Sequence, residues 1–85
     1  MNMAITETIT TFVRSATRLP DLTEDDQLFE TGIINSLFAV QLITFLEKTF
    51  GIDVGPDDLD IRNFASIKAT AAFVTTKNRH ALPVN

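Results

Sequence analysis

The segment GIINSLFAVQLITFLEKTFG, residues 32–51, carries the strongest helical pattern in this 85-residue chain. At about 100° per residue, its apolar side chains fall on one broad arc, which a core must cover. Gly51 stands where a residue in the left-handed region would close the helix. The pattern predicts a helix over residues 36–50, whose core face comprises Phe38, Ala39, Leu42, Ile43, Phe45, Leu46 and Phe50.

An amphipathic helix is expected closer to the N-terminus, over residues 4–18. Pro20 stops it, because proline cannot donate a backbone hydrogen bond. The apolar positions that recur at helical spacing are Ile5, Ile9, Phe12, Val13 and Ala16. Residues 19–35 follow as a long acidic loop. We expect this loop to be ordered, because three apolar side chains can anchor it on the core: Leu22, Leu28 and Phe29.

Two more helices are predicted beyond residue 51. Gly55-Pro56 breaks the chain, and a short helix over residues 57–62 begins with acidic side chains, which favour a helix N-terminus. Ser66 can cap a last helix over residues 66–79, before a frayed tail at residues 80–85. The expected fold is an all-α four-helix bundle, formed by residues 1–85 as a single domain with three longer helices and one short helix.

Composition and charge narrow the possible functions. Eleven acidic and seven basic side chains give a net charge of −4, which argues against nucleic acid or an anionic membrane as a partner. The chain has no cysteine and one histidine, so no metal site is expected. Its longest uncharged stretch, residues 31–46, is shorter than the roughly 20 apolar residues that span a bilayer. The N-terminus has no basic residue before Arg14, unlike a secretory signal, and we expect a cytoplasmic protein.

Two residues at the start of the helix predicted over residues 36–50 suggest more than a structural role. Leu37 lies on the polar face, where no core can cover it, although an isolated exposed leucine is common. Ser36 takes the first helical position, where free backbone N–H groups favour a bound or attached phosphate. Asn35 is an equally good cap, and if it caps the helix the Ser36 hydroxyl is free. Spacing alone favours a capping role for Ser36.

The stretch LFETGIINSL, residues 28–37, resembles the attachment motif of acyl and peptidyl carrier proteins. The resemblance continues through Gly51-Ile52 and residues 57–61 and 64–74, and so covers most of the chain. It implies the four-helix fold of that family. It also implies that Ser36 is modified rather than catalytic. Ser36 would hold a 4′-phosphopantetheine arm from coenzyme A, whose thiol carries an acyl group as a thioester.

The same resemblance implies a recognition surface around Ser36, which a phosphopantetheinyl transferase and later enzymes contact. Leu37 would be its exposed apolar residue. Acidic side chains of residues 21–30 would steer basic partner surfaces by electrostatic attraction. Docking should be weak and fast, and a shuttle of this kind is expected to be a monomer. The recognition surface comprises Asn35, Leu37, Val40, Gln41, Thr44 and Glu47.

The chain departs from the family pattern at Asn35, where most members have aspartate. Residues 32–42 look most like freestanding carriers of polyketide and hybrid peptide pathways for antibiotic biosynthesis. Some of these carry a glyceryl unit that becomes a hydroxymalonyl or methoxymalonyl extender. The implied partners are an acyl-loading enzyme, dehydrogenases or a methyltransferase, and an acyltransferase or ketosynthase. The alternative is a D-alanyl carrier protein, or another aminoacyl carrier, which has a similar size and motif.

Two rival classes remain open at this level. A hydrolase with Ser36 as nucleophile would need a general base, and His80, in the expected tail, is the one histidine available. An acidic helical adaptor would bind a partner helix through Leu37 and Val40 without a prosthetic group. The acidic residues 57–60 lack the ligand spacing of a calcium-binding loop.

Overall fold

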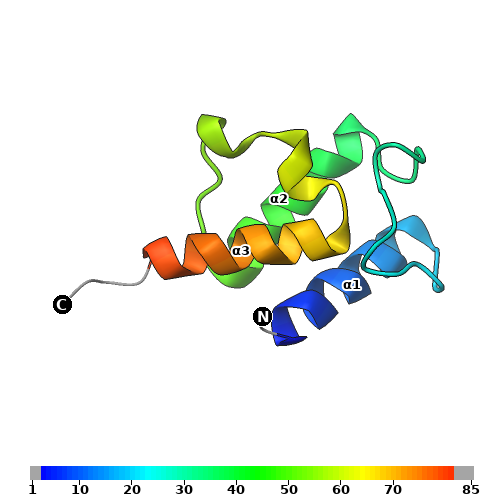
Figure 1. Cartoon of the computed structure of the whole chain (residues 1–85), viewed down its shortest axis with the longest axis horizontal. Coiled ribbons are helices and arrows are strands. Elements are labelled where there is room, and N and C mark those ends of the chain that lie inside the picture. The colour runs from blue at the N-terminus through cyan, green and yellow to red at the C-terminus, as the bar shows by residue number, and fades with distance from the viewer. Residues whose placement is uncertain (1–2, 82–85) are drawn as a thin grey trace.

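Every regular element within the described residues 3–81 is a helix (Figure 1). The computed structural model contains three α-helices and, between the second and third, two short 3₁₀-helices. The all-α fold predicted from the sequence is confirmed. In chain order, the elements are α1 Met3–Thr17, α2 Ser36–Phe50, η1 Pro56–Asp58, η2 Ile61–Phe64 and α3 Ile67–Ala81.

The core lies where the α-helices meet, and it is filled mainly by aliphatic side chains, together with Phe64 and Phe73. Burying one such side chain contributes about 1.5–3 kcal/mol to the free energy of unfolding. The predicted core position Ala16 is an exception, because the last turn of α1 runs past the core and leaves this side chain exposed. The fully buried aliphatic side chains include Ile9 and Val13 from α1, Leu42 and Leu46 from α2, and Ile67 and Val74 from α3.

Half-buried phenylalanines stack on one another where α1 contacts α2. The ring of Phe12 lies with its centroid 4.0 Å from that of Phe45 and 5.8 Å from that of Phe38. Phe50 meets Phe45 edge to face, with centroids 6.5 Å apart. Aromatic pairs at these separations add to the energy of burial. The broad apolar arc of α2 thus divides into a fully buried part, Leu42 and Leu46, and a half-buried margin that holds its phenylalanines together with Ala39 and Ile43.

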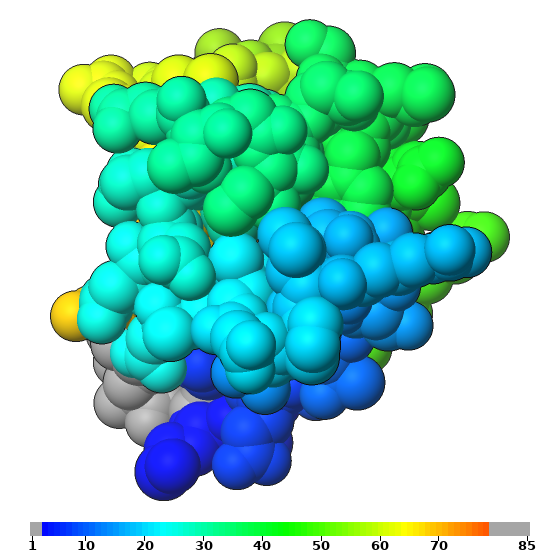
Figure 2. Space-filling model, turned by 90° about the vertical axis from the view of Figure 1, so that its right-hand side faces the viewer, coloured from blue at the N-terminus to red at the C-terminus, as the bar shows by residue number. Residues whose placement is uncertain are grey.

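The loop of residues 19–35 is held in place by main-chain hydrogen bonds. Leu28 N–H donates to Ala65 O (2.8 Å), and Lys68 N–H donates to Glu24 O (3.0 Å), so the loop is tied to the start of α3. Leu22 and Leu28 are buried, as expected of anchors. Figure 2 shows this loop, in cyan, covering the face between α1 in blue and the start of α2 in green.

The segment expected as one short helix, residues 57–62, instead forms two 3₁₀ turns, η1 and η2. The Asp58 carboxylate accepts the Gly55 N–H (3.0 Å), and the Asp60 carboxylate accepts the Arg62 N–H (2.9 Å). Aspartate side chains that bond locally to the backbone compete with a continuous helix. The backbone turns at Leu59, where φ is −81° and ψ is 60°. The prediction of a single helix there is wrong for this reason.

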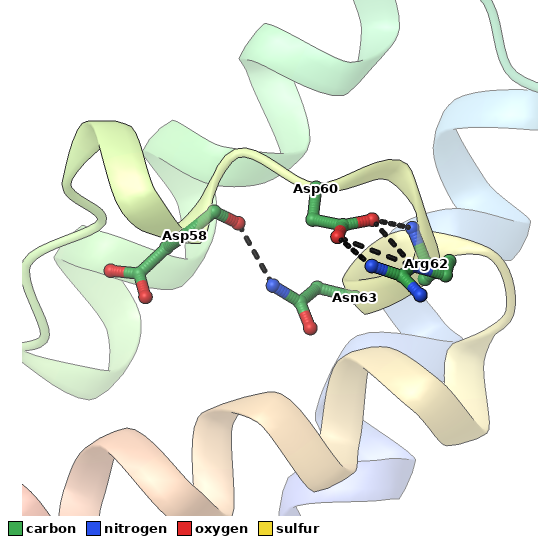
Figure 3. A network of polar contacts seen from close by, with 4 residues as sticks. All are labelled: Asp58, Asp60, Arg62 and Asn63. Atoms are coloured by element: carbon green, nitrogen blue, oxygen red, sulfur yellow. Dashed lines mark hydrogen bonds and ion pairs between the residues drawn. The ribbon is translucent and has the colours of Figure 1, made fainter.

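Polar contacts fix the two 3₁₀ turns to each other, as Figure 3 shows, and a further contact joins them to α3. Asn63 Nδ2 donates to Asp58 O (2.9 Å), and Lys77 Nζ lies 2.8 Å from Asp58 Oδ2. The hydrogen bond from Lys77 lowers the pKa of Asp58 below its ordinary value. At the start of η2, the Arg62 guanidinium donates to both oxygens of the capping residue Asp60, which lowers the pKa of Asp60 to about 2 and raises that of Arg62.

The ends of the outer helices differ slightly from expectation. α1 ends at Thr17, one residue early, and Arg18 follows in the left-handed region at φ 59°. The Leu19 N–H then donates to Arg14 O (3.2 Å), a bond typical of a helix that ends with a left-handed residue. α3 continues to Ala81, so residues 80 and 81 of the expected frayed tail are helical. The rest of that tail lies outside the described residues.

We expect Arg18→Gly to stabilise the fold, because a left-handed backbone strains any residue with a Cβ atom. Glycine also raises the entropy of the unfolded chain, so the net gain in the free energy of unfolding should be at most about 1 kcal/mol. Urea denaturation measures it. The matched control is Ala72→Gly at an exposed position within α3, which should lose about 1 kcal/mol. A loss of stability in Arg18→Gly would contradict this account of the α1 terminus.

The Asp60–Arg62 pair predicts a loss of stability in acid. The folded pKa of Asp60, about 2, lies below its ordinary value of 3.8, so the folded chain favours the charged carboxylate. Its contribution is fully present above about pH 4 and is lost as the pH falls toward about 2. The urea midpoint of the wild type should therefore fall more steeply over this window than that of Asp60→Asn, which keeps a capping oxygen but does not titrate. Equal slopes for the two proteins would contradict the assignment.

Candidate functional site

The start of α2 settles which residue caps this helix. Asn35 has an extended backbone, with φ −107° and ψ 179°, and its side-chain oxygen accepts the Phe38 N–H (2.9 Å). Its carbonyl oxygen accepts the first helical hydrogen bond, from Ala39 N–H (3.0 Å). Of the two candidate caps, Asn35 therefore takes this role, contrary to what spacing alone favours, and the Ser36 hydroxyl is not needed for it.

Ser36 is exposed on the first turn of α2. Within the described part of the chain, no side chain or backbone group forms a hydrogen bond with its hydroxyl. The N–H groups of Ser36 and Leu37 precede the first helical hydrogen bonds, and the positive end of the helix dipole lies here. An alcohol in this position can be esterified from solvent, and a phosphate attached to it suits the free N–H groups. The site thus fits a phosphate-linked group.

A shallow hollow of about 200 Å³ opens beside Ser36, between α2 and residues 59–64. Pockets that bury small ligands usually measure about 300–1,000 Å³, so this hollow is too small to enclose a substrate. Asp60 is the one ionisable side chain among the described residues that line it, and its carboxylate is paired with Arg62. A base for Ser36 is therefore lacking in this lining. The lining comprises Phe29, Ser36, Ala39, Ile43, Leu59, Asp60, Ile61 and Phe64.

The expected recognition residues lie mostly on the exposed face of α2. Leu37 and Val40 expose 70% and 61% of their surface, and Gln41 and Thr44 are also exposed. Glu47 differs from expectation: it is half-buried, and its carboxylate accepts the Val54 N–H (3.0 Å). This bond ties α2 to the following loop. Glu47 therefore serves the fold and is not a free contact.

Leu59 and Ile61 are exposed residues beside Ser36 that sequence reasoning missed. They expose 61% and 59% of their surface. Both stand next to Asp60, and both line the hollow that Ser36 also lines. The sequence signal was an apolar residue on each side of an aspartate in an otherwise polar connection. A single helix over residues 57–62, as the sequence predicts, gives no reason to place these two side chains beside Ser36.

The acidic loop has fewer free carboxylates than its composition indicates. Asp26 accepts the Thr23 N–H (2.8 Å) and so closes a turn, and Asp25 lies 4.0 Å from Lys68 Nζ. Exposed pairs such as the latter contribute about 0–1 kcal/mol. Three acids without such a local contact in the described structure remain exposed: Asp21, Glu24 and Glu30.

Two properties of the described residues bear on other kinds of site. Within residues 3–81, none of the helices combines the length and the hydrophobicity that a membrane span requires. The same residues contain no group of three histidine, cysteine or acidic side chains placed to hold a metal ion. The backbone of His80 is part of α3, and its side chain lies outside what the structure describes.

Comparison of the sequence with known protein families and proteins points to one family. The family model described as the phosphopantetheine attachment site matches residues 7–74. The chain is also similar to the D-alanyl carrier proteins of Lactococcus lactis subsp. cremoris, strains MG1363 and SK11, and of subsp. lactis strain IL1403. Each is 38% identical over 53 residues, which is 62% of this chain and 67% of the relative.

The family match extends over most of the chain and includes α2, the hollow and the two 3₁₀ turns. Its prosthetic group is linked through a phosphate, which agrees with the exposed hydroxyl and free N–H groups at the start of α2. The chain therefore belongs to the phosphopantetheine-binding carrier proteins, and its prosthetic group is 4′-phosphopantetheine.

Proposed function

We propose that the chain is an acyl carrier whose Ser36 Oγ bears the 4′-phosphopantetheine group as a phosphodiester. The observation that carries this proposal is the cap: Asn35 bonds to Phe38 N–H, and the Ser36 hydroxyl is left exposed at the helix N-terminus. The N–H groups of Ser36 and Leu37, together with the α2 dipole, favour the negative charge of the phosphate.

In the attachment reaction the chain is a substrate and not a catalyst. The Ser36 oxygen forms a bond to the pantetheine-linked phosphorus of coenzyme A, and adenosine 3′,5′-bisphosphate leaves. The serine proton passes to a base supplied by the phosphopantetheinyl transferase, since the described residues around Ser36 offer none. When attached, the group supplies a thiol that holds an acyl group as a thioester.

The carrier role requires that each partner bind briefly. A small surface around Ser36, made by Asn35, Leu37, Val40, Gln41 and Thr44, suits transient docking by successive enzymes. We place the protein in the cytoplasm, as a monomer that meets a transferase, an acyl-loading enzyme and enzymes that modify or consume the acyl group. The exposed position of Ser36 allows it to enter the active site of the transferase.

For the acyl group we propose a glyceryl-derived hydroxymalonyl or methoxymalonyl unit for polyketide or non-ribosomal peptide synthesis. The similarity of residues 32–42 to carriers of that kind supports it. Packing supports a small group that stays in solvent. Leu42 and Leu46 are fully buried, the stack of Phe12 on Phe45 closes one side of α2, and the hollow beside Ser36 measures only about 200 Å³.

D-alanine is the second candidate for the acyl group. Its support is the 38% identity to proteins named D-alanyl carrier protein. D-Alanyl and glyceryl units are both small and polar, so the packing argument suits either. The choice between them rests on the enzyme that loads the thiol.

The attachment proposal predicts that wild type, incubated with coenzyme A and a broad-specificity phosphopantetheinyl transferase, gains the mass of one phosphopantetheine. Ser36→Ala should gain nothing, because it lacks the nucleophilic oxygen. The matched control is Ser15→Ala, which removes an exposed serine hydroxyl from α1 and should react like wild type. Intact mass spectrometry measures all three. A gain in Ser36→Ala would move the attachment to another residue, and no gain in folded wild type would favour an adaptor without a prosthetic group.

The acyl proposal predicts which loading system charges the modified protein. A glyceryl-transferring enzyme with its glyceryl donor should form a thioester, detected by intact mass and removed by hydroxylamine. A D-alanine ligase with ATP and D-alanine should leave the protein uncharged. Efficient charging by the ligase alone would instead assign the chain as a D-alanyl carrier.

A further inference from the structure

A groove runs along one side of α1, away from Ser36. Its volume of about 730 Å³ lies within the range of about 300–1,000 Å³ that is usual for binding sites. Its lining shares no residue with the hollow beside Ser36, and the start of α1 lies well away from the start of α2 in Figure 1. The carrier role proposed above does not use this groove. The lining comprises Met3, Thr6, Glu7, Thr10, Thr11, Arg14, Thr23 and Glu24.

Two segments form the walls of the groove, and hydrogen bonds fix both of them. One wall is α1, and the other is the loop at residues 23–24. Arg14 Nε donates to Leu22 O (2.9 Å) and so joins α1 to the loop at one end of the groove. The Lys68 N–H donates to Glu24 O (3.0 Å), which holds the loop wall from the side of α3. The groove is therefore a preformed part of the fold.

Acceptors without partners are concentrated in this groove. Glu7 on α1 and Glu24 on the loop are exposed, and neither carboxylate forms a hydrogen bond or ion pair within residues 3–81. Thr6 Oγ1 is shielded from water and also has no hydrogen-bond partner in the described structure. Shielded polar atoms in folded proteins are almost always hydrogen-bonded, so this oxygen indicates a partner that the chain itself does not supply. With Arg14 as its cation, the lining has a net charge of −1.

These groups fit a basic peptide segment. Arginine presents its donors in a planar fork, which suits the carboxylates of Glu7 and Glu24. The Nη groups of Arg14 have no partner among the described residues, and they can donate to the backbone carbonyls of such a segment. Between Met3 and Arg14, α1 rises by about 16 Å, which about five residues of extended chain match. A polyamine is also cationic, but it offers no acceptor to Arg14.

We propose that this groove binds an arginine-bearing segment of a partner protein, with Glu7 and Glu24 as the acidic contacts. A partner held there leaves Ser36 exposed, so it retains the chain while a second enzyme acts at Ser36. Such a second contact raises the effective concentration of the carrier at its enzymes without tighter binding at Ser36 itself. The binding site does not depend on the attachment proposal, and only this retaining role rests on the proposed function.

The test is a titration of the ¹⁵N-labelled full chain with the peptide acetyl-Arg-Ala-Arg-Ala-Arg-amide, followed by amide chemical shifts. We expect the shifts to be confined to residues 3–14 and 22–24. The same peptide with citrulline in place of arginine keeps the shape, lacks the charge, and should not bind. Added salt should weaken the binding of the arginine peptide, because the contacts are exposed charges.

Variants of the chain assign the binding to the groove. Glu7→Gln/Glu24→Gln should raise Kd about fivefold, since each exposed ion pair contributes about two- to threefold. The matched control is Asp21→Asn/Glu30→Gln, which removes the same charge from exposed loop positions outside the lining and should stay within about twofold of wild type. Equal weakening by the two double variants would mean diffuse attraction by the acidic loop and would overturn the inference.

Further outcomes separate this inference from its rivals. If spermidine binds as tightly as the peptide, the groove is a site for small cations and the inference fails. Shifts centred on residues 36–43 would move the binding to the surface beside Ser36, and shifts on dilution of the protein alone would assign the groove to a second copy. With saturating peptide, a transferase should modify wild type within about twofold of the rate without peptide. Strong inhibition would overturn the retaining role, whereas no modification even without peptide would overturn only the attachment proposal.

Discussion

The hydrogen bond from Phe38 N–H to the side-chain oxygen of Asn35 fixes the first residue of α2, and the exposure of the proposed attachment residue Ser36 depends on it. Gly32, at φ 76°, turns the chain before the helix, and Ile34 is buried just ahead of the cap. With the start set there, Ser36 faces solvent while the buried side of α2 enters the core. A one-residue shift of the helix register against the core would rotate this pattern by about 100°.

A second constraint comes from the connection between α2 and α3. Glu47 binds the backbone of Val54, and Lys77 of α3 holds Asp58, so the chain between these contacts is fixed at both ends. The 3₁₀ turns then bring the exposed side chains of Leu59 and Ile61 to the hollow that Ser36 also lines. The surface beside Ser36 is thus assembled from one helix and one irregular segment, and its geometry depends on interactions that lie outside the surface itself.

The sequence predicted α2 in full, because a long helical period and a closing glycine act locally. It left Asn35 and Ser36 as competing caps, because both side chains can accept the same bond and only the backbone at Asn35 decides between them. It missed the division of residues 57–62 into two turns, where aspartate side chains compete with helical hydrogen bonds. The internal role of Glu47 depends on a contact seven residues along the chain that no local pattern indicates.

The central claim is that the cap of Asn35 frees the Ser36 hydroxyl to bear the phosphate. A ³¹P–¹H correlation spectrum of the modified protein tests it most directly, because the coupling passes only through the bonds of the ester. The account predicts one phosphodiester signal, correlated with the β protons of Ser36, while the Phe38 amide keeps its hydrogen bond to Asn35. A correlation with the side chain of any other residue, or loss of the Phe38 bond on modification, would contradict it.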